Sequence, residues 1–155
     1  MKVKFKRLNE LATVPSYAKS GDACFDLVAT SVKVSRGMLN YLEYGTGIAV
    51  EIPEGHVGLI FPRSSVTDKN LMLKNSVGVI DSGYRGEIKF RFDITSTNPD
   101  ADEALLYKPD DRLVYQVGDR IGQMMILPIP TVELEEVDEL SITERGEGGY
   151  GSTGH

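Results

Sequence analysis

The sequence predicts an all-β domain, built as a sandwich, a barrel or a jelly roll, and three observations support this fold class. Residues 87–95 alternate apolar and polar side chains, with Ile88, Phe90 and Phe92 on one face, which is the period of a half-buried strand. Many other short apolar segments follow at short intervals, separated by Gly, Pro, Asn or Asp. Helical periodicity is scarce. Many short strands with few helices are typical of these architectures.

The remaining elements are predicted in chain order from the same pattern. One short helix is expected near residues 66–71, and no internal repeat is found. The other predicted strands are residues 3–8, 25–34, 38–44, 47–52, 57–61, 113–117, 124–129 and 131–136.

A β-hairpin is predicted around residues 81–86. Val77, Val79 and Ile80 precede this segment, and the alternating strand 87–95 follows it. The segment holds two glycines and an Asp-Ser pair, residue types that favour a turn. We therefore predict that the two flanking strands pair with each other.

Two segments depart from the strand pattern. Residues 98–111 carry five acidic side chains and two prolines, which is typical of a solvated surface loop. Residues 145–155 contain five glycines and no apolar aliphatic side chain. Alone, this tail is expected to be disordered, because it offers almost nothing to bury.

Composition limits the class of protein. The length of 155 residues with 41% hydrophobic content suits one compact domain. The net charge of -6 argues against the broad positive field of nucleic-acid or membrane binders. Cys24 is the single cysteine, so no internal disulfide forms, and His56 and His155 do not complete a zinc site with it. No apolar run reaches 18 residues and no secretory leader is seen, so a cytoplasmic protein is expected, in the host cytoplasm if it is viral.

Generic catalytic motifs are missing, since the sequence has no GxxxxGK[ST] loop, HExxH, GxSxG or CxxC. Clusters of polar residues and glycines remain. They occupy residues 20–27, 62–65, 75–87, 118–123 and 145–155.

In order and spacing these clusters resemble the five motifs of the trimeric all-β dUTPase family, over residues 20 to 154. The most specific are GVIDSGYRG at 78–86, GDRIGQ at 118–123 and RGEGGYGSTG at 145–154. The resemblance implies a jelly-roll homotrimer that hydrolyses dUTP to dUMP and pyrophosphate, which lowers dUTP and supplies dUMP for thymidylate synthesis. It also implies that residues 1–144 form the β-barrel domain and residues 145–155 a lid, and that three subunits contribute to each active site.

Asp81 is the predicted catalytic residue. Alone, an aspartate at a turn favours an Asx-turn cap. The resemblance implies instead a general base that orients water for attack on the α-phosphorus. Tyr84 alone suggests packing under the turn, whereas the resemblance sets it against the deoxyribose, where it excludes a 2′-hydroxyl and so rejects UTP.

The other substrate contacts are also implied by the resemblance. Asn75 and the backbone of Val79, Ile80 and Asp81 match the uracil slot, and mismatched bases there leave buried groups unpaired. Lys89 matches a position near the substrate, although a solvated strand lysine fits equally. The predicted phosphate donors are Arg63, Ser64, Ser65, Gln123, Arg145, Ser152 and Thr153.

Three of these donors have plain structural alternatives. Arg63 alone suggests a surface ion pair, and Ser64 and Ser65 beside a proline suit a turn or a helix cap. Ser65 also stands where many family members have glycine.

Magnesium is the predicted cofactor. Asp26 matches the aspartate that holds Mg²⁺ through coordinated water, although a turn residue at a strand start is the alternative. Asp119 and Arg120 are expected to form a structural ion pair.

The tail is expected to close over bound nucleotide. The resemblance implies that Tyr150 stacks on uracil while Gly151, Ser152 and Thr153 approach the phosphates. Ordering about ten flexible residues costs entropy, so closure should require the triphosphate. Tyr150 stands where phenylalanine is commonest, and Gly122 where alanine is usual.

Three other functions are alternatives to dUTP hydrolysis. A dCTP deaminase of the same fold needs a glutamate in the base slot, and Glu87 lies past the turn. A nucleotide-gated regulatory protein would bind a partner, with residues 98–111 as the candidate contact. A purely structural jelly roll would not need all five clusters.

Overall fold

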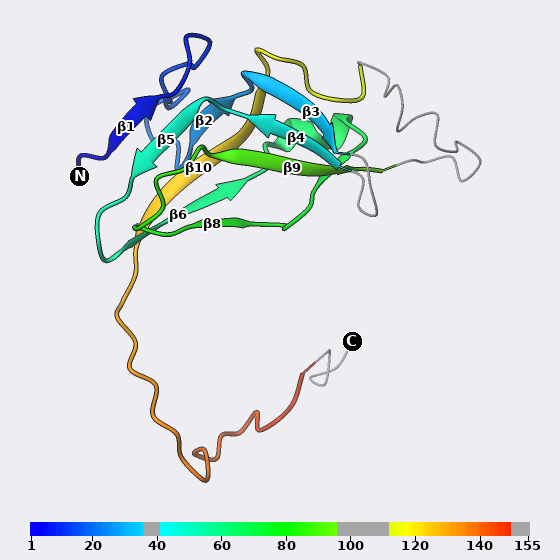
Figure 1. Ribbon diagram of the computed structural model, residues 1–155. Coiled ribbons are helices and arrows are strands. Elements are labelled where there is room, and N and C mark those ends of the chain that lie inside the picture. Colours follow the sequence, from blue (N-terminus) through cyan, green and yellow to red (C-terminus); the bar gives the residue numbers. More distant parts are fainter. Residues whose placement is uncertain (36–40, 96–111, 150–155) are drawn as a thin grey trace.

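The computed structural model describes residues 1–35, 41–95 and 112–149, and the chain folds into short strands as predicted (Figure 1). One 3₁₀ helix, η1 (Ser64–Asp68), accompanies them in the described part of the chain. The strands are β1 (Lys4–Arg7), β2 (Phe25–Val28), β3 (Ser31–Ser35), β4 (Tyr41–Gly45), β5 (Ile48–Glu51), β6 (His56–Phe61), β7 (Leu71–Leu73), β8 (Gly78–Ile80), β9 (Lys89–Ile94) and β10 (Arg120–Pro128).

The strands form two four-stranded sheets that make a jelly-roll-like sandwich. One sheet has the order β2-β10-β6-β8 and the other the order β3-β4-β9-β7, while β1 pairs with β5 in a two-stranded ribbon. All of these pairs are antiparallel. The all-β prediction is confirmed.

The core lies between the two sheets. Phe90 and Phe92 of β9 and Tyr44 of β4 have no exposed surface, and the rings of Tyr44 and Phe92 meet edge to face. Ile121 and Met124 of β10 are equally buried. The alternation seen in residues 87–95 therefore separates core side chains from surface ones, as predicted.

The predicted hairpin is wrong. β8 pairs with β6, whereas β9 pairs with β4 and β7, so the connection between β8 and β9 crosses from one sheet to the other. After the turn, the Ile88 backbone N–H donates to the Ile48 carbonyl and the Gly47 N–H donates to Glu87. These long-range contacts determine where the chain goes after the turn.

Other boundaries differ from the predictions. The expected strand 25–34 is two strands, and 38–40 of the expected strand 38–44 lie outside the described residues. Residues 113–117 are a loop rather than a strand, and residues 131–136 are exposed and form no strand. The expected helix at 66–71 is η1, which begins at Ser64, and β7 follows it.

The loop 113–117 is apolar because part of it is buried in the core, although it pairs with no described strand. Val114 and Tyr115 are buried, and the Tyr115 carbonyl accepts a hydrogen bond from the Tyr44 hydroxyl at 3.0 Å. Burial raises the pKa of the Tyr44 hydroxyl well above its usual range.

The chain beyond β10 leaves the body as an extended segment (Figure 1). Its apolar side chains point into solvent; Leu134, Leu140 and Ile142 are 91%, 86% and 100% exposed. These side chains form exposed apolar surface on the single chain.

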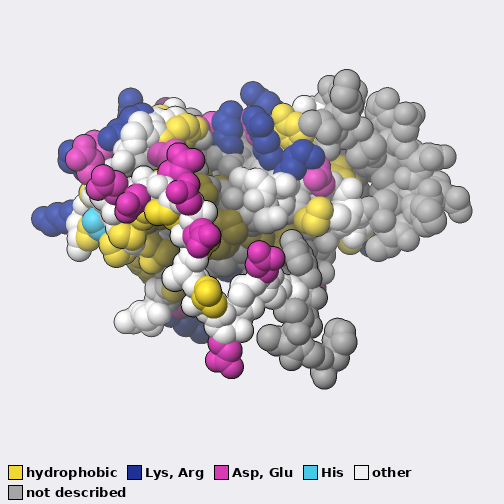
Figure 2. All heavy atoms as spheres, turned by 90° about the horizontal axis from the view of Figure 1, so that it is seen from below, with side chains coloured by type: hydrophobic (Ala, Val, Ile, Leu, Met, Phe, Trp, Pro, Cys, Tyr) yellow, Lys and Arg dark blue, Asp and Glu magenta, His cyan; other side chains and the backbone are white. Residues whose placement is uncertain are grey.

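The surface charge is mixed. Figure 2 shows that on one face the described Lys and Arg side chains form small groups beside acidic ones. Within the described ranges, no helix has the length and apolar character needed to cross a bilayer.

Gly122 packs directly against the Phe90 ring in the core. A Cβ built at Gly122 overlaps the Phe90 ring, with Phe90 Cδ1 at 2.9 Å. We therefore expect Gly122→Ala to lower the free energy of unfolding by about 1–3 kcal/mol, the usual cost of overpacking a core. Urea denaturation measures this change. Gly149→Ala, which meets open space, is the matched control, and equal stability of the two variants would contradict the prediction.

Candidate functional site

Four of the predicted base-side residues line one pocket. The pocket measures about 380 Å³ and lies where β7, β8 and β9 meet. Predicted residues Asn75, Ile80, Tyr84 and Lys89 line it together with Lys74, Glu87 and Arg91, which were not predicted. We call this the base-side pocket.

Two backbone features shape the base-side pocket. Ser76 has a φ of 58°, and the Val77 N–H donates to the Asn75 carbonyl at 2.5 Å, so a tight turn presents Asn75. β8 is the edge strand of its sheet, so one row of its main-chain donors and acceptors has no neighbouring strand among residues 1–35, 41–95 and 112–149. Val79 is 61% exposed on this edge. Such an edge can pair with the polar rim of a planar base.

Tyr84 is fixed at the mouth of the pocket. Its backbone N–H donates to the Asp81 carbonyl at 3.0 Å, which closes the turn. Its hydroxyl donates to the Glu87 carbonyl, also at 3.0 Å. These two bonds hold the side chain against the turn, and 43% of the residue is exposed.

Asp81 lies at the end of β8 and does not line the base-side pocket. The side chain is exposed, and within the described residues its carboxylate has no hydrogen bond or ion pair. An Asx-turn cap would bond a nearby backbone N–H, so the structure does not support that reading. The carboxylate is free to accept a proton from water.

Lys89, which lines the base-side pocket, forms ion pairs with two glutamates. Its Nζ lies 3.1 Å from Glu43 Oε1 and 3.7 Å from Glu87 Oε2, while Arg91 Nε donates to Glu43 Oε2 at 2.8 Å. Burial opposes ionisation of Glu43, but the bonds from Lys89 and Arg91 outweigh it and hold the pKa of that carboxyl below its usual range. The hydrogen bond to Glu43 raises the pKa of Lys89, so this side chain stays charged.

Glu43 should therefore stabilise the fold in a pH-dependent way. Its pKa is lower in the folded state, so its contribution is complete above the unfolded pKa of about 4.3 and is lost as pH falls through the folded pKa. We expect Glu43→Gln to lower the free energy of unfolding by about 1 kcal/mol at pH 7, and by much less at pH 3. Urea denaturation at both pH values measures the difference; a deficit that does not shrink at acidic pH would contradict the assignment.

Four of the predicted phosphate-side residues line a second pocket. It measures about 440 Å³ and includes Asp26, Arg63, Ser64 and Gln123. Its other lining residues are Ala18, Asp22, Ala23 and Cys24. We call this the phosphate-side pocket.

Asp26 is bound by two arginines. Arg63 Nε donates to one carboxylate oxygen at 2.8 Å and Arg120 Nη1 to the other at 3.0 Å. The predicted Asp119–Arg120 pair is thus wrong: Arg120 reaches across to β2, and Asp119 Oδ2 accepts from the Gln116 N–H at 2.7 Å. Arg63 does form an ion pair, which was the structural alternative to its role as a phosphate donor. In the described part of the chain, only its Nε takes part in a bond.

The donor set of the phosphate-side pocket fits Mg²⁺ bound through water. Among the described residues no group of three His, Cys, Asp or Glu side chains could hold a metal ion. Mg²⁺ does not need such a cage, because it keeps several waters and takes one or two carboxylates plus substrate phosphates. Each Asp26 oxygen accepts one arginine bond and retains a lone pair for a metal-bound water.

The remaining phosphate-side side chains have local partners. Ser65 Oγ lies 3.2 Å from the Tyr115 hydroxyl, and Gln123 Nε2 donates to the Pro62 carbonyl at 3.0 Å. Burial raises the pKa of the Cys24 thiol, and the Asp26 charge adds to the shift. The thiol therefore stays protonated near neutral pH, which makes Cys24 a poor nucleophile.

Of the predicted tail residues, the structure describes Arg145 alone, and Arg145 lines neither pocket. Arg145 is exposed, and its Nε donates to the Gly148 carbonyl at 2.9 Å. Tyr150, Gly151, Ser152 and Thr153 lie outside the described residues, as does the acidic segment 98–111. Their predicted roles stay predictions.

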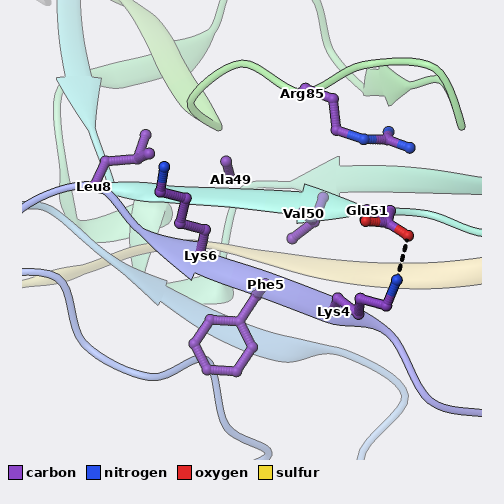
Figure 3. A pocket seen from close by; sticks show the side chains of 8 residues that line it. All are labelled: Lys4, Phe5, Lys6, Leu8, Ala49, Val50, Glu51 and Arg85. Atoms are coloured by element: carbon purple, nitrogen blue, oxygen red, sulfur yellow. Dashed lines mark hydrogen bonds and ion pairs between the residues drawn. The ribbon is translucent and has the colours of Figure 1, made fainter.

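A third groove lies between β1, β5 and Arg85 (Figure 3). It measures about 330 Å³ and contains none of the predicted site residues. Lys4 spans its rim and binds Glu51 at 2.8 Å, which lowers the pKa of that carboxyl.

Comparisons with known proteins agree on one family. The family model of dUTPases matches residues 10–101 and 104–154. The chain is 39% identical over 155 residues to a deoxyuridine 5′-triphosphate nucleotidohydrolase of Hydrogenobaculum sp., covering 99% of both chains. It is 40% identical to the protein of the same description from Corynebacterium glutamicum, covering 98% of this chain and 94% of that one.

Solved structures give the same result. A mutant dUTPase of Staphylococcus bacteriophage 80alpha with dUpNHpp superposes with a TM-score of 0.80 at 29% identity, covering 99% of both chains. A mutant dUTPase from phage phi11 of S. aureus, described as revealing the coordination of a structural Mg(II) ion, has a TM-score of 0.69 at 26% identity. That comparison covers 90% of this chain and 98% of the other.

Proposed function

The chain belongs to the dUTPase family and hydrolyses dUTP, and on that premise we propose that its two pockets are the two halves of the dUTP site. The base-side pocket would take the uracil and deoxyribose, and the phosphate-side pocket the triphosphate. The single observation that carries this proposal is the sorting of the predicted residues. Asn75, Ile80 and Tyr84 line one pocket, and Asp26, Arg63, Ser64 and Gln123 line the other.

Asp81 is the proposed general base. Its carboxylate is exposed and unpaired within the described residues, at the end of the β8 edge next to Ile80. A base there accepts a proton from the water that attacks the α-phosphorus, and the products are dUMP and pyrophosphate. The turn hydrogen bond from Tyr84 to the Asp81 carbonyl supports a fixed position for this group.

The β8 edge and Tyr84 are proposed to select the nucleotide. Main-chain groups of Val79, Ile80 and Asp81 would pair with the uracil edge, and Asn75 would complete the slot. Leaving two polar groups buried and unpaired costs about 1–3 kcal/mol each, so a cytosine base is rejected. The Tyr84 ring would exclude a ribose 2′-hydroxyl.

Cationic and hydroxyl groups are proposed to bind the triphosphate. Arg63 keeps its terminal nitrogens for phosphate oxygens, while Asp26 fixes its orientation through Nε. Ser64, Ser65 and Gln123 add neutral donors, and Arg145, Ser152 and Thr153 of the tail add the rest. Bound Mg²⁺, held through water by Asp26, would neutralise triphosphate charge and orient it.

A homotrimer with shared sites is proposed. The separation of the two half-sites within one chain supports it, since neither pocket contains the complete residue set. The exposed apolar side chains of the extended segment after β10 also support burial against another subunit. In this arrangement residues 1–144 are the domain and residues 145–155 the lid over a neighbouring subunit's site, in a cytoplasmic enzyme.

The rival functions are not favoured. The family match and the relatives' descriptions point to dUTP hydrolysis rather than to deamination of dCTP or to regulation alone. In the structure, Glu87 lines the base-side pocket, but its Oε1 is engaged by the Gly47 N–H. A protein partner at residues 98–111 stays a prediction.

Pyrophosphate release from dUTP, dCTP, dTTP and UTP tests the proposal. We expect turnover of dUTP alone, stimulated by Mg²⁺ and reduced by a chelator. Turnover of dCTP with ammonia release would support the deaminase instead. Absence of turnover with every nucleotide would contradict the enzyme assignment.

A further inference from the structure

Gly86 is a glycine that the backbone does not require. Its φ lies outside the left-handed region, unlike those of Gly47, Gly55 and Gly118. The constraint on Gly86 is spatial. A Cβ built there would have Tyr84 atoms as its three nearest neighbours, with Cζ at 2.5 Å and Cε2 at 3.0 Å.

The Tyr84 ring occupies the space that a side chain at residue 86 would need. Two contacts of different kinds hold it there: the hydroxyl bond to the Glu87 carbonyl and the ring's packing over the bare Cα of Gly86. Tyr84 also lines the base-side pocket. The position of this pocket wall therefore depends on residue 86.

We propose that Gly86 is a specificity-determining residue that acts through Tyr84. Its missing side chain seats the aromatic ring at the depth that excludes a 2′-hydroxyl, and the Glu87 carbonyl fixes the ring's tilt. This inference rests on the proposed role of Tyr84 against the deoxyribose. It adds that residue 86 determines where the Tyr84 ring lies.

The expected displacement of the Tyr84 ring is large enough to affect the discrimination between dUTP and UTP. Non-bonded carbon atoms settle at about 3.5–4.0 Å, so an alanine methyl at residue 86 must shift the ring by on the order of 1 Å. A ring shift of this size is comparable to the space that a 2′-hydroxyl needs. Gly86→Ala should therefore weaken discrimination between dUTP and UTP while the alanine itself stays compatible with the backbone.

The test compares the ratio of kcat/KM for dUTP to that for UTP in matched variants. We expect Gly86→Ala to lower this ratio by about ten- to a hundredfold, the effect of misplacing a site group by 1 Å. Gly83→Ala lies in the same turn and its Cβ meets open space, so the ratio should stay within about twofold of wild type. Circular dichroism and Tm confirm that both variants are folded.

A double-variant cycle separates positioning from general damage. In a Tyr84→Ala background, where the ring is gone, Gly86→Ala should change the ratio by less than about twofold. If Gly86→Ala retains the wild-type ratio while Tyr84→Ala loses it, the inference is overturned and the role of Tyr84 stands. If Gly83→Ala is as damaging, or if the two effects add in the double variant, the inference is also overturned. A wild-type ratio in Tyr84→Ala would refute the proposed role of Tyr84 and this inference together.

Discussion

Asp81→Asn is expected to reduce kcat for dUTP by about a thousandfold, within the range that a positioned general base contributes. Asparagine has nearly the same shape but cannot accept the proton of the attacking water. Because the Asp81 side chain is exposed and has no bond to other described residues, the change should not disturb the fold. Nucleotide affinity, measured by calorimetry with a non-hydrolysable dUTP analogue, should stay within about threefold.

Asp68→Asn is the matched control for this prediction. Asp68 is also exposed but lies in η1, outside both pockets. It should retain wild-type turnover. A kcat for Asp81→Asn within tenfold of wild type would exclude Asp81 as the base, since the lower limit for such a group is about a hundredfold.

Removal of residues 145–155 is expected to cost about a hundredfold or more in kcat/KM for dUTP while the oligomer stays intact. The truncation deletes the predicted phosphate donors Arg145, Ser152 and Thr153 and the stacking residue Tyr150. None of the described residues 145–149 is buried in the core, and Arg145 bonds locally, to the Gly148 carbonyl. Steady-state kinetics measures kcat/KM, and size-exclusion chromatography with light scattering measures the mass of the oligomer.

A chain that lacks only His155 is the control for the truncation and should behave as wild type. Normal dUTP hydrolysis by the longer truncation would refute the lid. Loss of the oligomer would show that the tail has an assembly role instead.

Mixing the two inactive variants tests whether sites are shared. If the base of one subunit works with the tail of another, co-refolded Asp81→Asn and truncated chains regain about one quarter of the sites. Each active site would combine an intact Asp81 from a truncated chain with a tail from an Asp81→Asn chain. If each site lay within one subunit, no activity would return.

The strand content could be predicted from the sequence, but the pairing of strands could not. Alternation along β9 reflects which face is buried, and it is visible locally. The partner of β9 is decided by long-range contacts with β4, such as Phe90 opposite Tyr44, which lies 46 positions earlier in the chain. The turn residues after β8 predict that the chain changes direction, but they do not predict which sheet contains the next strand.

The candidate site shows the same division. Matched motifs identified Asn75, Tyr84, Asp26 and Arg63 by number, and the structure groups them into two pockets. Lys74 and Arg91 were missed because they reach the base-side pocket only through the pairing of β7 with β9.

The position of Arg120 also required the structure. Asp119 and Arg120 are neighbours in sequence, but Asp119 accepts from the Gln116 N–H in the turn before β10, whereas Arg120 begins the strand. The arginine therefore binds Asp26 on β2.

The crossing of the chain from β8 to β9 links the two halves of the sandwich through the base-side pocket. A nucleotide held between these strands would join the two sheets, so binding should oppose their separation. Amide hydrogen exchange would then slow in both sheets at once, even at strands far from the ligand. The same crossing makes the pocket sensitive to core packing, since loosening of the sheets would spread the pocket walls before the chain unfolds.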